Sequence, residues 1–257
     1  MARAQEEDQS VSELQMHQEQ QAPREGAGID WHPLFRADIR DKLYGRWGQA
    51  VWSAFSKFIP SGCKALEVGC GSGRIVARAV AELDVEGYGI DISTDAIAYA
   101  RRVGIALGAH PTWLLGSGFA LPFAQATFGV VLSEGVIEHF SSQDIDRMVA
   151  EHVRVCVPGG RVVISVPNQL NIPLTYHKLR MGKDYMWYPE KSFTVLELAS
   201  LMKRHGLHIV AWTGFAPTQA LEWFWQINTK AHRLDRILPS WILALVGYET
   251  LVVGVKK

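Results

Sequence analysis

The feature that most constrains the fold of this chain is a regular alternation of short apolar strands with helical segments. Strands such as 128–133 and 161–166 are built around continuous apolar runs rather than alternating polar and apolar positions. Strands of this kind are buried on both faces, which requires a mostly parallel sheet covered by helices on each side. Because crossover connections between parallel strands are right-handed, the expected architecture is a doubly wound α/β fold.

The positions of the other elements follow from apolar periodicity and from residues that start or stop helices. The predicted strands are 64–68, 87–92, 112–115, 128–133, 161–166, 208–213 and 249–255. The predicted helices are 35–59, 74–83, 94–107, 141–157, 192–204 and about 218–238. Ser93 or Thr94 is expected to cap the third of these helices, and Ser192 or Thr194 the fifth. Ser141 begins an apparent capping box for the fourth helix.

Composition divides the chain into a polar tail and one domain. Residues 1–28 are rich in Gln and Glu and hold too few apolar residues to offset the entropy of ordering, so a disordered tail is expected there. Residues 29–257 are expected to form a single domain, for which 48% hydrophobic residues in the chain supply a core. Within it, 29–60 is expected to be an N-terminal helical cap. An insertion after the fifth strand, 168–192, shows no apolar periodicity.

Charge and cysteine usage disfavour several classes of protein. The 26 basic and 26 acidic residues cancel, so no nucleic-acid partner is expected. The three cysteines form no CxxC pair and no spacing with histidine that is typical of metal ligands, so neither a disulfide framework nor a metal site is expected. A reducing, cytoplasmic location is the default expectation. No signal peptide is expected, and no apolar run reaches the length of a membrane span.

A glycine-rich turn after the first strand predicts a nucleotide-like ligand. The segment 65-ALEVGCGSG-73 places three glycines between an apolar strand and an amphipathic helix. Glycine is needed where φ is positive or where a ligand presses on the backbone, and ligands of such sheets bind at the carboxyl ends of the strands. The spacing matches neither the dinucleotide fingerprint nor a P-loop. Asp91, at the tip of the second strand, can accept hydrogen bonds from both ribose hydroxyls of an adenosine.

Four segments together resemble the successive motifs of class I S-adenosylmethionine-dependent methyltransferases, in particular the branch that methylates small molecules. They are 65-ALEVGCGSG-73, 88-YGIDIS-93, 120-ALPFAQATFGVVLSEGVIEHF-140 and 158-PGGRVVISVPN-168. The resemblance implies a Rossmann-like sheet of seven strands in the order 3-2-1-4-5-7-6, with 249–255 as an antiparallel strand 7. It also implies S-adenosylmethionine as cofactor and S-adenosylhomocysteine as product.

The resemblance also implies which residues hold the cofactor. They are Glu67, Gly69, Cys70, Gly71, Gly73, Asp91, Ile92, Ser117, Gly118, Phe119, Glu134, Gly135 and Tyr44. Glu67 is expected to brace the glycine turn, Ile92 to pack on the adenine, and Tyr44 to reach the carboxylate of the cofactor. The family usually carries an aspartate where Ser117 stands, which implies a weaker contact with the adenine amino group.

Three residues are candidates for a general base. Methyl transfer from a sulfonium depends mostly on alignment, and a base is needed only if the acceptor must lose a proton. His139, after the fourth strand, is the first candidate, and its alternative role is capping or packing. Tyr176 and His177, in the insertion 168–192, are the second candidates. That insertion is expected either to form a substrate lid or to pack its aromatic residues onto the domain.

The expected function is transfer of a methyl group to a small, apolar or aromatic acceptor on oxygen, nitrogen or carbon, by a monomer or homodimer. Two alternatives remain open. One is a non-catalytic binding or assembly module, suggested by the missing acidic residues at Ser117 and Gly129. The other is a lipid-like or macromolecular acceptor. The apolar segment 237–246 leaves membrane contact open, although a buried helix beneath the last strand is the favoured interpretation.

Overall fold

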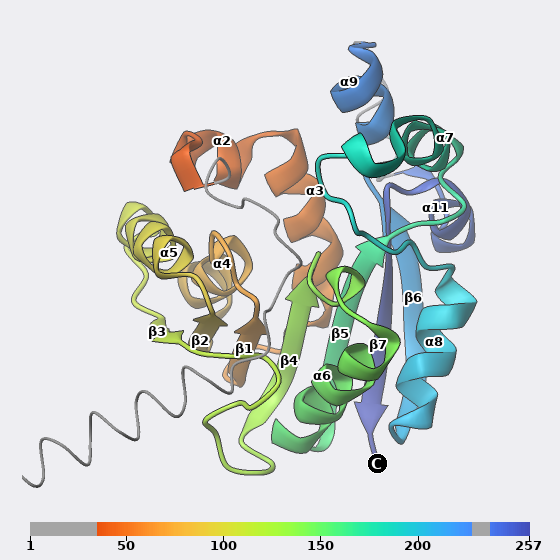
Figure 1. The fold of residues 1–257 in the computed structure, drawn as a ribbon. Coiled ribbons are helices and arrows are strands. Elements are labelled where there is room, and N and C mark those ends of the chain that lie inside the picture. Colours follow the sequence, from red (N-terminus) through yellow and green to blue (C-terminus); the bar gives the residue numbers. More distant parts are fainter. Residues whose placement is uncertain (1–34, 228–236) are drawn as a thin grey trace, which may run out of the picture.

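The computed structural model describes residues 35–227 and 237–257. Their central feature is a sheet of seven strands (Figure 1). The strands are β1 (Lys64–Val68), β2 (Glu86–Asp91), β3 (Thr112–Leu115), β4 (Phe128–Glu134), β5 (Cys156–Pro167), β6 (Leu207–Phe215) and β7 (Glu249–Lys256). Their order is β3-β2-β1-β4-β5-β7-β6, and β7 is antiparallel to both β5 and β6. The topology implied by the resemblance is therefore confirmed.

Helices cover both faces of this sheet and its carboxyl edge. They are α2 (Ile39–Tyr44), α3 (Arg46–Phe55), α4 (Arg74–Leu83), α5 (Thr94–Leu107), α6 (Ser142–Val155), α7 (Ile172–Met181), α8 (Val195–Arg204), α9 (Gln219–Trp225) and α11 (Ser240–Val246). The described residues also include the short 3-10 helices η2 (Ser56–Phe58), η3 (Ile137–His139) and η4 (Gly182–Asp184). Helices α2, α7 and α9 lie near the carboxyl edge of the parallel strands, at the top of Figure 1.

Neighbouring residues of the central strand β4 bury their side chains in two different clusters. Val131 belongs to a cluster with Met148 of α6 and Leu198 of α8. Leu132 belongs to a second cluster with Phe55 of α3 and Ile75 of α4. Burial of each such side chain contributes roughly 1.5–3 kcal/mol, so strand and helices hold one another in register. This explains why the strands are apolar at consecutive positions.

Two segments differ from the prediction. The predicted helix 35–59 is divided at Gly45, which has extended ψ at 168° and is both the C-cap of α2 and the N-cap of α3. The insertion 168–192 was expected to be irregular, but it contains the helix α7. Its N-cap Asn171 accepts a hydrogen bond from the backbone N–H of Leu174, and a proline stands in the first turn. These capping signals were present in the sequence, whereas apolar periodicity was not.

Two further predictions concern the chain ends. Helix α9 ends at Trp225, and the remainder of the predicted helix 218–238 falls largely on residues 228–236, which lie outside the described part, as does the tail 1–28. The segment 237–246 contains α11, where Leu243 and Ala244 are buried but Trp241 is 58% exposed. Only one face of this helix is therefore packed. Among the described residues, no helix has the length and apolar character needed to span a membrane.

Candidate active site

A cavity of about 940 Å³ lies at the carboxyl ends of β1, β2 and β4, which is where ligands of doubly wound sheets bind. Its lining comes from the turn after β1, the tips of β2 and β4, the helices α2, α3 and α9, the segment 186–190 and the start of β7. This volume is at the upper end of the usual range for small-molecule pockets, roughly 300–1,000 Å³. The cavity can therefore hold more than one small molecule.

The glycine turn forms one side of the cavity. Gly69, Gly71 and Gly73 have φ values of +63°, +49° and +64°, which favour glycine at all three positions. A Cβ at Gly73 would lie 2.3 Å from the ring of Trp113, and one at Gly69 would lie 2.7 Å from Val136. At Gly71 the nearest contact would be Phe35 at 4.0 Å, and Gly71 lines the cavity. Gly69 and Gly73 thus allow close packing, whereas Gly71 keeps space open for a ligand.

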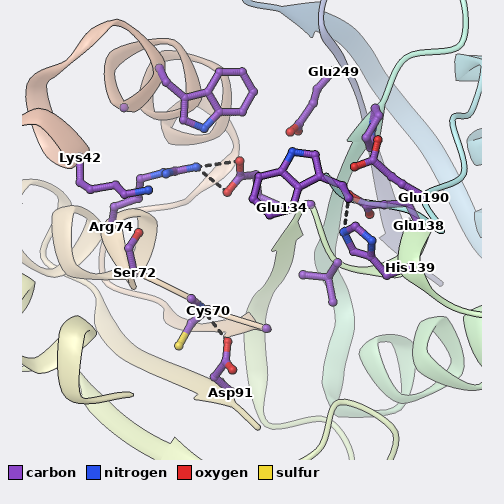
Figure 2. A pocket seen from close by; sticks show the side chains of 18 of the residues that line it. Lys42, Cys70, Ser72, Arg74, Asp91, Glu134, Glu138, His139, Glu190 and Glu249 are labelled. Atoms are coloured by element: carbon purple, nitrogen blue, oxygen red, sulfur yellow. Dashed lines mark hydrogen bonds and ion pairs between the residues drawn. The ribbon is translucent and has the colours of Figure 1, made fainter. Parts of the chain in front are cut away.

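Two carboxylates fix the conformation of this turn. Asp91 accepts a hydrogen bond from the backbone N–H of Gly71 at 2.8 Å (Figure 2) and another from that of Ser93 at 2.9 Å. Burial raises the pKa of Asp91, and these hydrogen bonds oppose the increase. Glu67 lies beneath the turn, is 3% exposed, and accepts a hydrogen bond from the N–H of Val76 at 3.0 Å. Burial raises the pKa of Glu67 to about 8.

An ion pair joins the turn to the tip of β4. The guanidinium of Arg74, the first residue of α4, donates to both carboxylate oxygens of Glu134, at 2.7 and 2.6 Å. Lys42 of α2 also lines the cavity, and its pKa is lowered by burial and then by the charge of Arg74. We call the glycine turn, Asp91, Lys42 and the Arg74–Glu134 pair the turn end of the cavity.

Four side chains form an acidic end on the other side of the cavity: Glu138, His139, Glu190 and Glu249 (right of Figure 2). Burial raises the pKa of Glu138 well above its usual value, and the charges of Glu190 and Glu249 raise it further. Burial and then Glu134 raise the pKa of Glu249 in the same direction. Burial lowers the pKa of His139 to about 4.

The partners of these acidic-end residues come from distant parts of the chain. Lys178 of α7 forms an ion pair with Glu190. Burial raises the pKa of Glu190, and the positive charge of Lys178 opposes this increase. The hydroxyl of Ser165 on β5 donates to Glu249 at 2.5 Å. The sequence analysis missed Lys42, Arg74, Glu138, Glu190 and Glu249. Arg74 directly follows the quoted segment 65–73 and Glu138 lies within the quoted segment 120–140, but no sequence signal marks the other three.

An aromatic wall, which we define as Trp47, Trp223, Phe224 and Tyr248, closes the cavity between its two ends. The ring of Trp47 lies 5.1 Å from that of Trp223 and 5.4 Å from that of Tyr248. Met186 and Trp187 of the insertion also line the cavity. Aromatic faces attract cations and stack on planar groups, so this wall suits an onium centre or a ring-shaped ligand.

The structure brings together nine of the residues that the sequence analysis named. Those that line the cavity are Gly69, Cys70, Gly71, Asp91, Ile92, Gly118, Glu134, Gly135 and His139. Glu67, Gly73, Ser117 and Phe119 lie behind this surface. The hydroxyl of Ser117 accepts a hydrogen bond from the N–H of Phe119 at 3.1 Å. Phe119 is 7% exposed and packs on Phe140. Ser117 and Phe119 therefore determine the shape of the loop that contains them.

Tyr44, Tyr176 and His177 do not line the cavity. Tyr44 is half exposed, and the guanidinium of Arg78 lies 5.6 Å from its ring centroid. His177 stacks on Phe224 at 4.0 Å, and Tyr176 lies 5.5 Å from the ring of Trp225. His177 therefore supports the aromatic wall from behind. The insertion packs aromatic rings through α7, and residues of its second half line the cavity, whereas its role as a substrate lid stays a prediction.

Comparison with known proteins places this geometry in a family. Residues 65–160 match the family described as a methyltransferase domain. The chain is 34% identical to a 2-phytyl-1,4-naphtoquinone methyltransferase of Thermosynechococcus vestitus, over 59% of this chain and 75% of that protein. It is 31% identical to the ajmaline N-methyltransferase of Rauvolfia serpentina over 38% of this chain, and the match spans 34% of that protein's length.

Solved structures agree on the fold. A SAM-dependent methyltransferase from Aquifex aeolicus superimposes with a TM-score of 0.58 at 14% identity, over 89% of this chain and 100% of that chain. With the strand order and the family match, this confirms the Rossmann-like methyltransferase architecture. The chain belongs to the class I S-adenosylmethionine-dependent methyltransferases.

Proposed function

We propose that this chain transfers the methyl group of S-adenosylmethionine to a small, ring-containing acceptor. The observation that carries the proposal is a single cavity whose turn end suits an adenosyl group and whose aromatic wall suits a planar acceptor. Relatives named as naphtoquinone and ajmaline methyltransferases support a small molecule as acceptor. The cofactor supplies a methyl group already activated on a sulfonium.

The residues at the turn end fit this cofactor. Gly71 provides a cradle that a side chain would fill, and the Asp91 carboxylate would hold the ribose hydroxyls. Ile92 is 52% exposed at the cavity surface and would pack on the adenine. Lys42 would pair with the carboxylate of the methionine moiety, in place of Tyr44. Glu134 would attract its ammonium group.

The charge of the cavity supports a cationic ligand. Seven acidic and three basic residues line it, so its net charge is negative. A concave site lined by one sign of charge concentrates ligands of the opposite sign. A sulfonium beside the aromatic wall would gain in addition the attraction of a cation to aromatic faces.

Positioning is the main contribution that the protein makes to this reaction. Of the three candidate bases, only His139 borders the cavity, and the pKa near 4 that burial gives it makes it neutral but weakly basic at pH 7. Alignment of reacting groups in small-molecule reactions is worth ~7–11 kcal/mol. The aromatic wall and the insertion would supply this alignment by holding the acceptor plane and excluding water.

Calorimetry tests the proposal most directly. S-adenosylmethionine and S-adenosylhomocysteine should each bind with one site per chain. Asp91→Ala should weaken both by ~10-fold or more, because a hydrogen bond to a charged group is worth roughly 1.5–3 kcal/mol. Asp95→Ala, in the first turn of α5, is the matched control because Asp95 does not line the cavity. Absence of heat with both ligands would refute the cofactor, and equal effects of the two variants would refute the role of Asp91.

A further inference from the structure

The acidic end contains three metal-ligating side chains in one place. One ligand atom each from Glu138, His139 and Glu190 lies within 4.8 Å of the other two. Glu138 and His139 belong to η3 after β4, and Glu190 belongs to the second half of the insertion. All three line the cavity, and Figure 2 shows their side chains gathered at one side of it.

Glu138 lacks a partner that its burial requires. It is 2% exposed, and its Oε2 atom makes no hydrogen bond within the described part of the chain. Its Oε1 atom lies 3.8 Å from Nε2 of His139. Burying a carboxylate without a partner is costly, so its presence in the wall of a cavity indicates a missing cation or donor.

The charges around Glu138 also favour a cation. Glu190 and Glu249 both act on it as like charges. The ammonium of Lys178 forms an ion pair with Glu190. It also donates a hydrogen bond to the hydroxyl of Ser192 at 2.7 Å. Three carboxyl groups share one ammonium, so their full ionisation would leave an excess of negative charge that one divalent ion would offset.

We propose that Glu138, His139 and Glu190 form a binding site for one divalent cation of the Mn²⁺ or Mg²⁺ class, with open coordination positions facing the cavity. Carboxylate and imidazole donors suit first-row divalent ions. Bonds of about 2.1 Å place ligand atoms within roughly 4.2 Å of one another, so small side-chain rotations would complete the site. His139 also has a hydrogen bond to the backbone of Pro189, an arrangement that typically orients a histidine ligand.

The site gives the acidic end a role toward the acceptor. An ion held there could bind an oxygen atom of the acceptor beside the aromatic wall, which selects acceptors with a hydroxyl or carbonyl group. This role rests on the proposed function, whereas binding of the ion does not. The sequence analysis expected no metal site, because these ligands come from two segments about fifty residues apart and form no recognised spacing.

Titration of the chelator-treated protein with Mn²⁺, followed by electron paramagnetic resonance, tests the site. The wild-type chain should bind one ion, and Mg²⁺ should compete. Glu138→Gln and Glu190→Gln should each weaken Mn²⁺ binding by ~10-fold or more, since even outer-shell changes cost 10–100-fold. Glu222→Gln is the matched control, because Glu222 lines the same cavity but pairs with Arg46 at 2.8 Å. No saturable binding by the wild type, or equal effects of Glu138→Gln and Glu222→Gln, would overturn the proposal.

Thermal melting provides a second readout that does not depend on activity. Without metal and at alkaline pH, Glu138→Gln should melt above the wild type, because it removes a buried carboxyl group whose ionised form is costly. With Mn²⁺, the wild type should gain stability and Glu138→Gln should not. A wild type that is not stabilised by Mn²⁺ would count against the site. Calorimetry with S-adenosylhomocysteine on the same chelated sample tests the cofactor separately, so the two proposals fail independently.

Discussion

The two ends of the cavity balance their charges differently. At the turn end, Asp91 accepts two backbone hydrogen bonds and Glu134 forms an ion pair with Arg74. At the acidic end, burial and then the charges of Glu190 and Glu249 raise the pKa of Glu138, and Lys178 pairs with Glu190. The carboxylates of Asp91 and Glu134 thus have partners within the chain, whereas the three carboxyl groups of the acidic end share the ammonium of Lys178, and the proposed cation would supply the further positive charge. A Glu→Gln substitution should therefore destabilise the chain at Glu134 and stabilise it at Glu249.

The largest predicted effect concerns Glu67, which lies beneath the turn end. Replacing it should change how the free energy of unfolding depends on pH. Its pKa is about 8 in the folded chain because of burial, against an ordinary value of 4.5. Between these values the folded state binds more protons than the unfolded state, so Glu67 makes stability fall as the pH rises. Glu67→Gln should remove this fall, with a gain of about 4 kcal/mol at pH 8 and almost none at pH 4.5.

Urea unfolding of both proteins across this pH range measures the difference. The amide oxygen of Gln can still accept the hydrogen bond from Val76, so the turn itself should be preserved. Parallel pH profiles for the two proteins would show that folding leaves the pKa of Glu67 at its ordinary value, which would contradict the prediction.

Glu134→Gln should destabilise the turn end. It leaves the guanidinium of Arg74 without a counter-charge, and the side chains of the pair are only 9% and 16% exposed. Breaking a buried pair by removing one partner costs about 3 kcal/mol or more. The double variant Arg74→Met, Glu134→Gln should recover much of the loss, because neither charge remains. Urea unfolding of the three proteins tests this, and a single variant as stable as the wild type would show that the pair contributes nothing.

Glu249→Gln should have the opposite sign and stabilise the metal-free chain. It removes one of the crowded carboxylates, and the amide can still accept the hydrogen bond from Ser165. Replacing a poorly compensated buried charge by a neutral group gains about 1 kcal/mol or more. The exposed pair of Glu86 with Lys64 offers a control, since Glu86→Gln should leave the melting temperature nearly unchanged. A lower melting temperature for Glu249→Gln would remove the contrast between the two ends.

The same contrast explains how far the sequence could predict the site. The turn end is built from strand tips and the turn that follows each, so local patterns in 64–91 predicted Gly71 and Asp91 at the cavity. The bounds of β1, α4, α5 and β3 were also predicted correctly from such patterns. The acidic end combines η3, the insertion and the start of β7. Long-range packing decides this arrangement, and no local pattern reports that Glu190 and Glu249 will meet Glu138.

Helix α2 illustrates the same limit within the turn end. Tyr44 was predicted to reach the cofactor, but Asp41 and Lys42 are the residues of α2 that line the cavity. Periodicity located the helical segment, yet the break at Gly45 decides how α2 is rotated relative to α3. Side-chain direction on a short helix thus depends on a backbone detail that apolar spacing does not encode.

Gly71→Ala should give the smallest change in stability but a specific loss of cofactor binding. Placing an L-residue at a φ of +49° costs about 1 kcal/mol, and the new methyl group would point into open space in the cavity. Gly108→Ala is a matched control: its φ is +64°, its Cβ would meet no described atom within 4 Å, and it does not line the cavity. Both variants should therefore melt slightly below the wild type, but only Gly71→Ala should weaken binding of S-adenosylhomocysteine in calorimetry. If both variants bind S-adenosylhomocysteine equally well, Gly71 is required only for its backbone conformation. The ligand would then have to contact another part of the turn end.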